Sequence, residues 1–94
     1  MIKIMIKIIS QQFNNKMIVI QDDEDIKYMF SYGTCIIKKS SDLNNPYQYY
    51  IELDAKYWDY STTTGKHRNA FLGETKAETQ AKINSGEYKL TNLN

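Results

Sequence analysis

Hydrophobic and polar residues alternate along two stretches of the chain, residues 1–9 and residues 47–58. In the first, MIKIMIKII, isoleucine occupies positions 2, 4, 6 and 8, and lysine lies among the intervening residues. In the second, YQYYIELDAKYW, every second residue from Tyr47 to Leu53 is aromatic or aliphatic. Successive side chains of a strand point to opposite faces, so both patterns predict strands with one buried face. Glu52 and Asp54 share the other face of the second strand, which we expect to be solvated.

Shorter apolar runs predict further strands. Asn14 and Asn15 tolerate positive φ and are suited to a hairpin turn, after which residues 16–20 form a β-branched return strand. Residues 34–40 predict another strand, followed by a turn-rich connector over residues 40–46. For two segments the sequence allows two interpretations each. Residues 22–30 suit either a short helix capped by Asp22 or a polar loop entering an aromatic strand, and residues 87–93 suit a short final strand or a tail.

The pattern changes to helical after residue 58. Ser61 or Thr62 is suited to cap a helix with the sequence TTTGKHRNAFL, which Gly73 ends. Thr75 and Glu78 form a capping box for a second helix, which ends before Gly86. The expected fold is therefore α+β: an antiparallel sheet of four to five strands with the two short helices of the C-terminal half packed on one face. Residues 1–94 are expected to form a single domain.

Composition narrows the classes of function. The net charge is +1, from 12 basic and 11 acidic side chains, which argues against an acidic DNA mimic and an indiscriminate nucleic-acid binder. The single cysteine, Cys35, lies beside two isoleucines and is expected to be buried and structural, in a protein of a reducing cytosol. No apolar run is long enough for a membrane span, so a soluble protein without membrane contact is expected.

Three sequence features suggest a phosphate or metal site, but each lacks the spacing or the number of residues that such a site requires. TTTGKH ends like a phosphate-binding loop, but Tyr60 stands where that loop needs its first glycine and His67 where it needs a hydroxyl. The acidic run QDDED lacks the glycine and glutamate spacing of a calcium loop. One cysteine and one histidine do not suffice for a zinc site within one chain. No metal, cofactor or catalytic residue is expected, and the protein is not expected to be an enzyme.

The cations at the start of the first helix stand out, because positive charge opposes the helix dipole there. A partner or a salt bridge explains Lys66 and Arg68 better than helix stability does. His67 is interpreted as a packed or hydrogen-bonded structural residue in preference to a catalyst. Aromatic residues beside cations also suit binding surfaces for proteins or single-stranded nucleic acid. The candidate binding residues are Tyr50, Trp58, Tyr60, Lys66, His67 and Arg68.

Two segments, SYGTCI (31–36) and YWDYSTTTGKHRNAFLGET (57–75), resemble a family of small bacteriophage proteins of unknown function. Members of that family have a similar strand motif, S-Y-x-T-x-I, and a similar motif at the start of a helix, Y-S-x-T-T-x-K-H. The resemblance implies a phage or prophage accessory protein that works in the cytoplasm of the bacterial host, and it brings no catalytic residues with it. It also implies a recurring polar unit, either a hydrogen-bonded link between strand and helix or a shared binding surface, made of Tyr32, Thr34, Tyr60, Ser61, Thr63, Lys66 and His67.

We therefore expect a non-enzymatic protein that binds and blocks a bacterial target, a host protein or a nucleoprotein complex. By analogy it is an anti-defence inhibitor of the anti-CRISPR kind. The alternative is a small nucleic-acid-binding module, which requires Lys38, Lys39, Lys66 and Arg68 to gather on one face beside tyrosines. An enzyme would require His67 in a cleft beside a nucleophile or paired carboxylates. Exposed strand edges are compatible with a homodimer.

Overall fold

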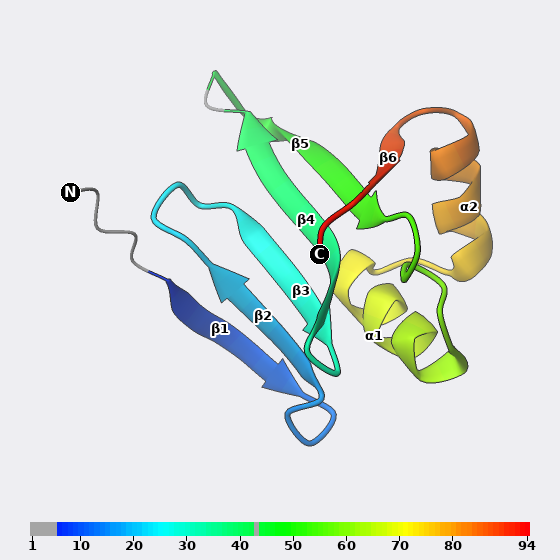
Figure 1. The fold of residues 1–94 in the computed structure, drawn as a ribbon. Helices are drawn as coiled ribbons and strands as arrows, with labels where there is room; N and C mark the ends of the chain where they lie inside the picture. Colours follow the sequence, from blue (N-terminus) through cyan, green and yellow to red (C-terminus); the bar gives the residue numbers. More distant parts are fainter. Residues whose placement is uncertain (1–5, 43) are drawn as a thin grey trace.

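The strands form one sheet whose spatial order follows the chain (Figure 1). The computed structural model describes residues 6–42 and 44–94. Strands β1 to β5 pair antiparallel, and β6 pairs parallel to β5. The elements are β1 (Lys7–Gln12), β2 (Met17–Gln21), β3 (Lys27–Ser31), β4 (Thr34–Asp42), β5 (Asn45–Asp54), α1 (Thr62–Leu72), α2 (Lys76–Asn84) and β6 (Tyr88–Thr91).

The expected α+β class with two helices in the C-terminal half is confirmed, with two corrections to the sheet. It has six strands instead of four to five, and it is mixed instead of antiparallel. Both corrections involve β6. The two helices carry the chain back before it pairs again with β5, and such a crossover produces a parallel neighbour.

The open segment between β2 and β3 is a turn and not a helix. The carboxylate Oδ1 of Asp22 accepts hydrogen bonds from the backbone amides of Glu24 (2.9 Å) and Ile26 (3.0 Å). Asp25 has a φ of 62°, which reverses the chain. An aspartate that bonds amides two and four residues ahead stabilises a turn at the expense of a helix, and β3 begins directly afterwards.

Several expected strand limits were wrong. The described part of β1 continues to Gln12, beyond the expected strand at 1–9, whose first five residues lie outside the described ones. Its expected buried face is also wrong, because Ile6 and Ile8 are exposed at the edge of the sheet. The expected connector over 40–46 was wrong at both ends, because β4 extends to Asp42 and β5 begins at Asn45. The strand expected at 47–58 ends at Asp54, whose Oδ2 accepts hydrogen bonds from the backbone amides of Lys56 (3.1 Å) and Tyr57 (2.9 Å) and starts a turn.

The helix limits agree with the capping residues. Ser61 caps α1 by accepting a hydrogen bond from the amide of Thr64 at 3.1 Å, and Gly73 ends it in the left-handed conformation. Thr75 and Glu78 form the expected capping box of α2. No helix in the described part of the chain has the length and apolarity that crossing a membrane requires.

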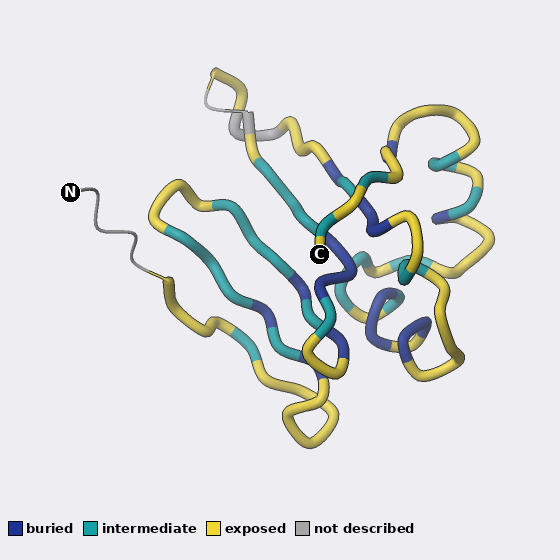
Figure 2. The backbone as a smooth tube through the Cα atoms, in the orientation of Figure 1, coloured by how far each residue is buried: buried dark blue, intermediate teal, exposed yellow. Residues whose placement is uncertain are grey.

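The core lies between the sheet and the two helices, where Figure 2 shows the longest buried stretches in β4, β5 and α1. Tyr57, Trp58 and residues of both helices pack against it. Its buried members are Met17, Val19, Met29, Ile36, Ile37, Ile51, Leu53 and Tyr88.

The last residues of the chain cross the sheet near β4 and β5, where Figure 1 shows the C-terminus. The side chain of Asn94 bonds the backbone amide and carbonyl of Cys35 at 3.0 and 2.9 Å. Cys35 is buried as expected. Asp54 was expected on a solvated face but is buried, because its Oδ1 accepts hydrogen bonds from Leu93 N (2.8 Å) and Asn94 Nδ2 (3.1 Å).

Candidate functional site

His67 is fully buried at the end of the sheet where the β1–β2 and β3–β4 hairpins turn. Its Nδ1 lies 2.7 Å from the hydroxyl of Ser31, the last residue of β3. Burial lowers the pKa of His67 below its ordinary value of 6.5, and the charge of Lys16 lowers it further. The imidazole is therefore neutral near pH 7, and its Nε2 has no hydrogen-bond partner among the described residues.

A chain of hydroxyl groups continues from Ser31 to the start of α1. The hydroxyl oxygens of Ser31 and Thr64 are 3.4 Å apart, and the Ser61 hydroxyl donates to Thr64 Oγ1 at 3.1 Å. The contacts of Ser31 with Thr64 and His67 join residues more than thirty positions apart in the chain. Two members of the recurring polar unit, Ser61 and His67, therefore take part in a hydrogen-bonded link between strand and helix. Their partners in this link, Ser31 and Thr64, were not named in the unit.

Two aromatic side chains from the hairpin turns cover the imidazole. The ring centroids of Phe13 and Tyr32 lie 4.7 and 5.7 Å from that of His67. The amide of Tyr32 donates to the carbonyl of Lys16 at 2.8 Å, which holds the two turns side by side. Phe13 is nevertheless 46% exposed and Tyr32 55% exposed, so both residues are also accessible from solvent.

The backbone at both aromatic residues is strained. Phe13 has a φ of 55° and Tyr32 a φ of 52°. Left-handed backbone costs a residue with a side chain about 1–2 kcal/mol, and glycine or asparagine adopts it most readily. Tyr32 and Gly33 form the two-residue turn between β3 and β4, both with positive φ, a position that favours Asn-Gly. The turns therefore do not explain why phenylalanine and tyrosine stand there.

A cavity of about 280 Å³ opens beside Tyr32. Tyr60, 68% exposed, lines it, and its ring centroid is 5.3 Å from that of Tyr57, another lining residue. Seven of the eight lining residues carry a hydroxyl group, and the hydroxyls of Ser31, Ser61 and Thr64 already belong to the hydrogen-bonded chain described above. The lining residues are Ser31, Tyr32, Thr34, Ile36, Tyr57, Tyr60, Ser61 and Thr64.

We define the hairpin-end surface as Phe13, Tyr32 and Tyr60 with this cavity and the buried His67. Sequence reasoning named Tyr60, His67, Tyr32 and Thr34, which the structure brings to this surface or its cavity. It missed Phe13, although an aromatic residue directly before Asn14-Asn15 was a signal that could have been used.

The other expected binding residues lie elsewhere. Lys66 is exposed and lines a different hollow. Arg68 is buried, and its Nη1 donates to the carbonyl of Trp58 at 2.8 Å and to Asp59 at 3.1 Å. A hydrogen bond from Lys76, together with that from Arg68, holds the pKa of Asp59 below its ordinary value despite the opposing effect of burial. The salt-bridge interpretation of the helix-start cations therefore holds for Arg68.

The basic residues of the nucleic-acid alternative do not gather on one face. Lys38 and Lys39 are neighbours on β4 and point to opposite sides of the sheet. Lys38 pairs with Glu52 at 3.7 Å, whereas the Nζ of Lys39 lies 4.1 Å from the ring centroid of Tyr49. Tyr50 is exposed on the same side as Glu52, away from the hairpin-end surface.

Ser31 and His67 form a hydroxyl–imidazole pair beside a cavity, which meets part of the condition set for an enzyme. In the triads of serine hydrolases, a carboxylate bonds the second ring nitrogen and orients the imidazole. Over residues 6–42 and 44–94, Nε2 of His67 has no such partner. In the same residues no three His, Cys, Asp or Glu side chains are arranged to hold a metal ion.

A comparison with family models gives one match, to a family of unknown function, DUF8033, over residues 6–87. The chain belongs to this family. The DUF8033 match includes both hairpin turns and all of α1, so it contains every residue of the hairpin-end surface. No curated protein and no solved structure matches the chain.

Proposed function

We propose that this member of DUF8033 is a non-catalytic binding protein that contacts a macromolecular target through the hairpin-end surface. The observation that carries the proposal is the pair of exposed aromatic residues, Phe13 and Tyr32, held at positive φ over a buried imidazole. Strained backbone that folding does not require is typical of functional positions. Aromatic residues on a rigid support are also the side chains that contribute most to protein interfaces.

The resemblance to bacteriophage proteins supplies the setting of the proposal. In that setting the protein is phage-encoded and acts in the bacterial cytoplasm, where it covers and blocks a surface of a host protein or nucleoprotein complex. An anti-defence inhibitor of the anti-CRISPR kind is one form of this function, and it rests on the resemblance alone.

The test is affinity capture from a bacterial host lysate, with and without nuclease, using the wild type and the double variant Phe13→Asn/Tyr32→Asn. Asparagine tolerates positive φ, so the variant keeps both turns while removing both rings. Thermal unfolding checks that it stays folded. Tyr50→Ser is the matched control, because Tyr50 is equally exposed but lies away from the hairpin ends.

A stoichiometric protein partner that survives nuclease is expected to bind the wild type and Tyr50→Ser but not the double variant. Capture of the same partner by the folded double variant would contradict the proposed surface. Loss of every partner on nuclease treatment would instead favour the nucleic-acid alternative.

A further inference from the structure

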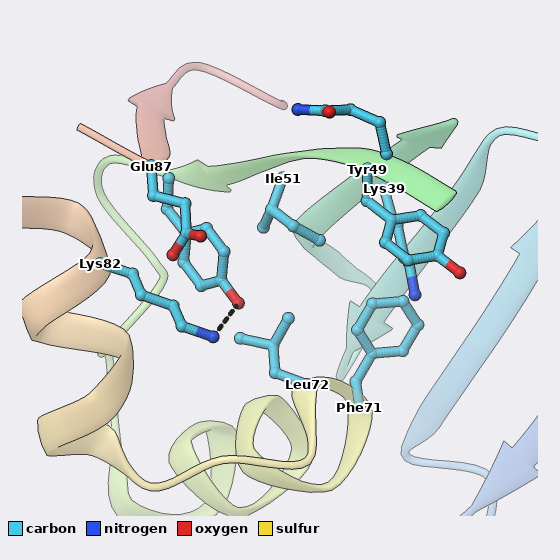
Figure 3. A pocket seen from close by; sticks show the side chains of 9 residues that line it. Lys39, Tyr49, Ile51, Phe71, Leu72, Lys82 and Glu87 are labelled. Atoms are coloured by element: carbon cyan, nitrogen blue, oxygen red, sulfur yellow. Dashed lines mark hydrogen bonds between the residues drawn. The ribbon is translucent and has the colours of Figure 1, made fainter. Parts of the chain in front are cut away.

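A second cavity, of about 410 Å³, lies between the sheet and the two helices (Figure 3). Strands β4, β5 and β6 form one side, and the C-terminal end of α1 and α2 form the other. Most of the exposed lining is polar, and Ile51, Phe71 and Leu72 contribute its smaller apolar part. Its volume falls within the range of about 300–1,000 Å³ that is typical of small-molecule sites.

Lys39 lines this cavity. Its Nζ lies over the ring of Tyr49, and it forms no ion pair with any of the side chains that the structure describes. Lys27 is directly opposite Lys39 in the β3–β4 ladder. Like charges at directly opposed positions destabilise a sheet. Burial lowers the pKa of Lys39, and the charge of Lys27 lowers it further, so an anion bound at Lys39 would relieve an existing repulsion.

The other charged groups restrict what else can bind. Lys82 already has a counter-ion, because its Nζ donates to Glu74 at 2.7 Å and lies 3.4 Å from the hydroxyl of Tyr88. Glu87 lines the side of the cavity away from Lys39 in Figure 3. A second anionic group on the ligand would meet the Glu87 carboxylate, which disfavours dicarboxylates and polyphosphates.

We propose that this cavity binds a small monocarboxylate with a short apolar body. The carboxylate lies at Lys39, and the body lies against Ile51, Phe71 and Leu72. This ligand site is separate from the hairpin-end surface and does not depend on the function proposed for it.

The test is titration with hexanoate, followed by two-dimensional amide NMR spectra, which also show whether each variant is folded. Hexanamide is the uncharged probe and adipate the dicarboxylate. Lys39→Met removes the charge and keeps an apolar stem. Lys38→Met is the matched control, since Lys38 is the adjacent residue on the opposite face and has its own partner in Glu52.

Hexanoate is expected to shift the amide signals of cavity residues and to saturate. Binding should weaken about fivefold for hexanamide and for Lys39→Met, the ratio that about 1 kcal/mol of a partly exposed ion pair represents. Lys38→Met should bind as the wild type does. Adipate should bind more weakly than hexanoate, and Glu87→Gln should reduce that difference.

Shifts that do not saturate would overturn the proposal, because they indicate only unspecific association. Equal affinity for hexanoate and hexanamide in the wild type would also overturn it, independently of any variant. So would hexanoate binding that Lys39→Met leaves unchanged, or that both lysine variants weaken equally.

Discussion

Replacing Asp54 by asparagine is expected to destabilise the domain strongly. The carboxylate is 2% exposed and accepts four hydrogen bonds. Its Oδ2 accepts the amides of Lys56 and Tyr57 in the turn that leads to α1. Its Oδ1 accepts Leu93 N and Asn94 Nδ2 from the end of the chain. Asparagine keeps the shape but turns one of the two oxygens into a donor that faces two N–H groups.

The expected loss is about 3 kcal/mol. Hydrogen bonds to a charged group contribute about 1.5–3 kcal/mol each, and two of the four are lost while the other two become neutral. The whole domain, at about 0.05–0.15 kcal/mol per residue, has a stability of roughly 5–14 kcal/mol. A loss of this size lowers the melting temperature by roughly 12–24 °C, at about 4–8 °C per kcal/mol for a domain of this length.

The loss of stability in Asp54→Asn should become smaller as the pH falls. Burial alone would raise the pKa of Asp54, but the hydrogen bonds to Leu93, Tyr57, Asn94 and Lys56 outweigh it and hold the pKa below its ordinary value of 3.8. A carboxyl group with a depressed folded-state pKa contributes stability that is complete above the unfolded-state pKa. That stability is lost as pH falls through the folded-state pKa. The wild type and Asp54→Asn should therefore differ most near neutral pH and progressively less below the ordinary pKa.

Urea unfolding measures this difference near neutral pH and near about pH 3, with fluorescence of Trp58, the single tryptophan, as the signal. Glu52→Gln is the control, because Glu52 shares the face of Asp54 but forms only a partly exposed ion pair with Lys38. Such pairs contribute about 0–1 kcal/mol. A loss below about 1 kcal/mol in Asp54→Asn, or a loss of the same size at both pH values, would refute the reasoning.

Three further predictions concern α1 and the sheet. Gly65→Ala should stabilise the protein by about 0.5–1 kcal/mol in thermal unfolding, because a Cβ there would meet its nearest side-chain atom, Arg68 Nη2, at an ordinary 3.4 Å; a lower melting temperature would contradict this. Arg68→Lys should lower the free energy of unfolding in urea by about 2 kcal/mol, because the hydrogen bonds to Trp58 and Asp59 are lost. The control Lys66→Met, at an exposed position, should change that free energy by less than about 0.5 kcal/mol. Burial, with the nearby charge of Asp54, raises the pKa of Cys35 to about 11. Cys35 should therefore react with thiol reagents at mildly alkaline pH only after the protein is unfolded. Rapid labelling of the folded protein would contradict this prediction.

Features of the fold that depend on neighbouring residues were predictable from the sequence. Ser61, Gly73 and the Thr75–Glu78 pair limit the helices through contacts within a few positions, so local rules are sufficient there. The strand limits were harder to predict. The end of β5 depends on Asp54, and two of the partners of Asp54 come from the last residues of the chain, 39 and 40 positions later.

The candidate site divides in the same way. The motif containing His67 was visible in the sequence, but the rings that cover His67 come from Phe13 and Tyr32, far away in the chain. Spacing along the chain carries no information about that contact. A salt bridge was one of the two explanations given for Arg68, but its partner could not be identified from the sequence, because the helix dipole accounts for the cost of a cation at a helix start and not for a tertiary contact with Asp59.

The residues of the strand motif (31–36) and the helix-start motif (60–67) fall into two groups according to what they contact. Ser31, Thr64 and His67 are buried, and the hydrogen bonds of Ser31 to the other two form the link between β3 and α1. The same link leaves Tyr32 and Tyr60 exposed, and it does not require the strained backbone of Tyr32. A motif that served folding alone would favour Asn-Gly at that turn. The presence of tyrosine there, next to a second strained aromatic residue on the neighbouring hairpin, supports the binding surface that we propose.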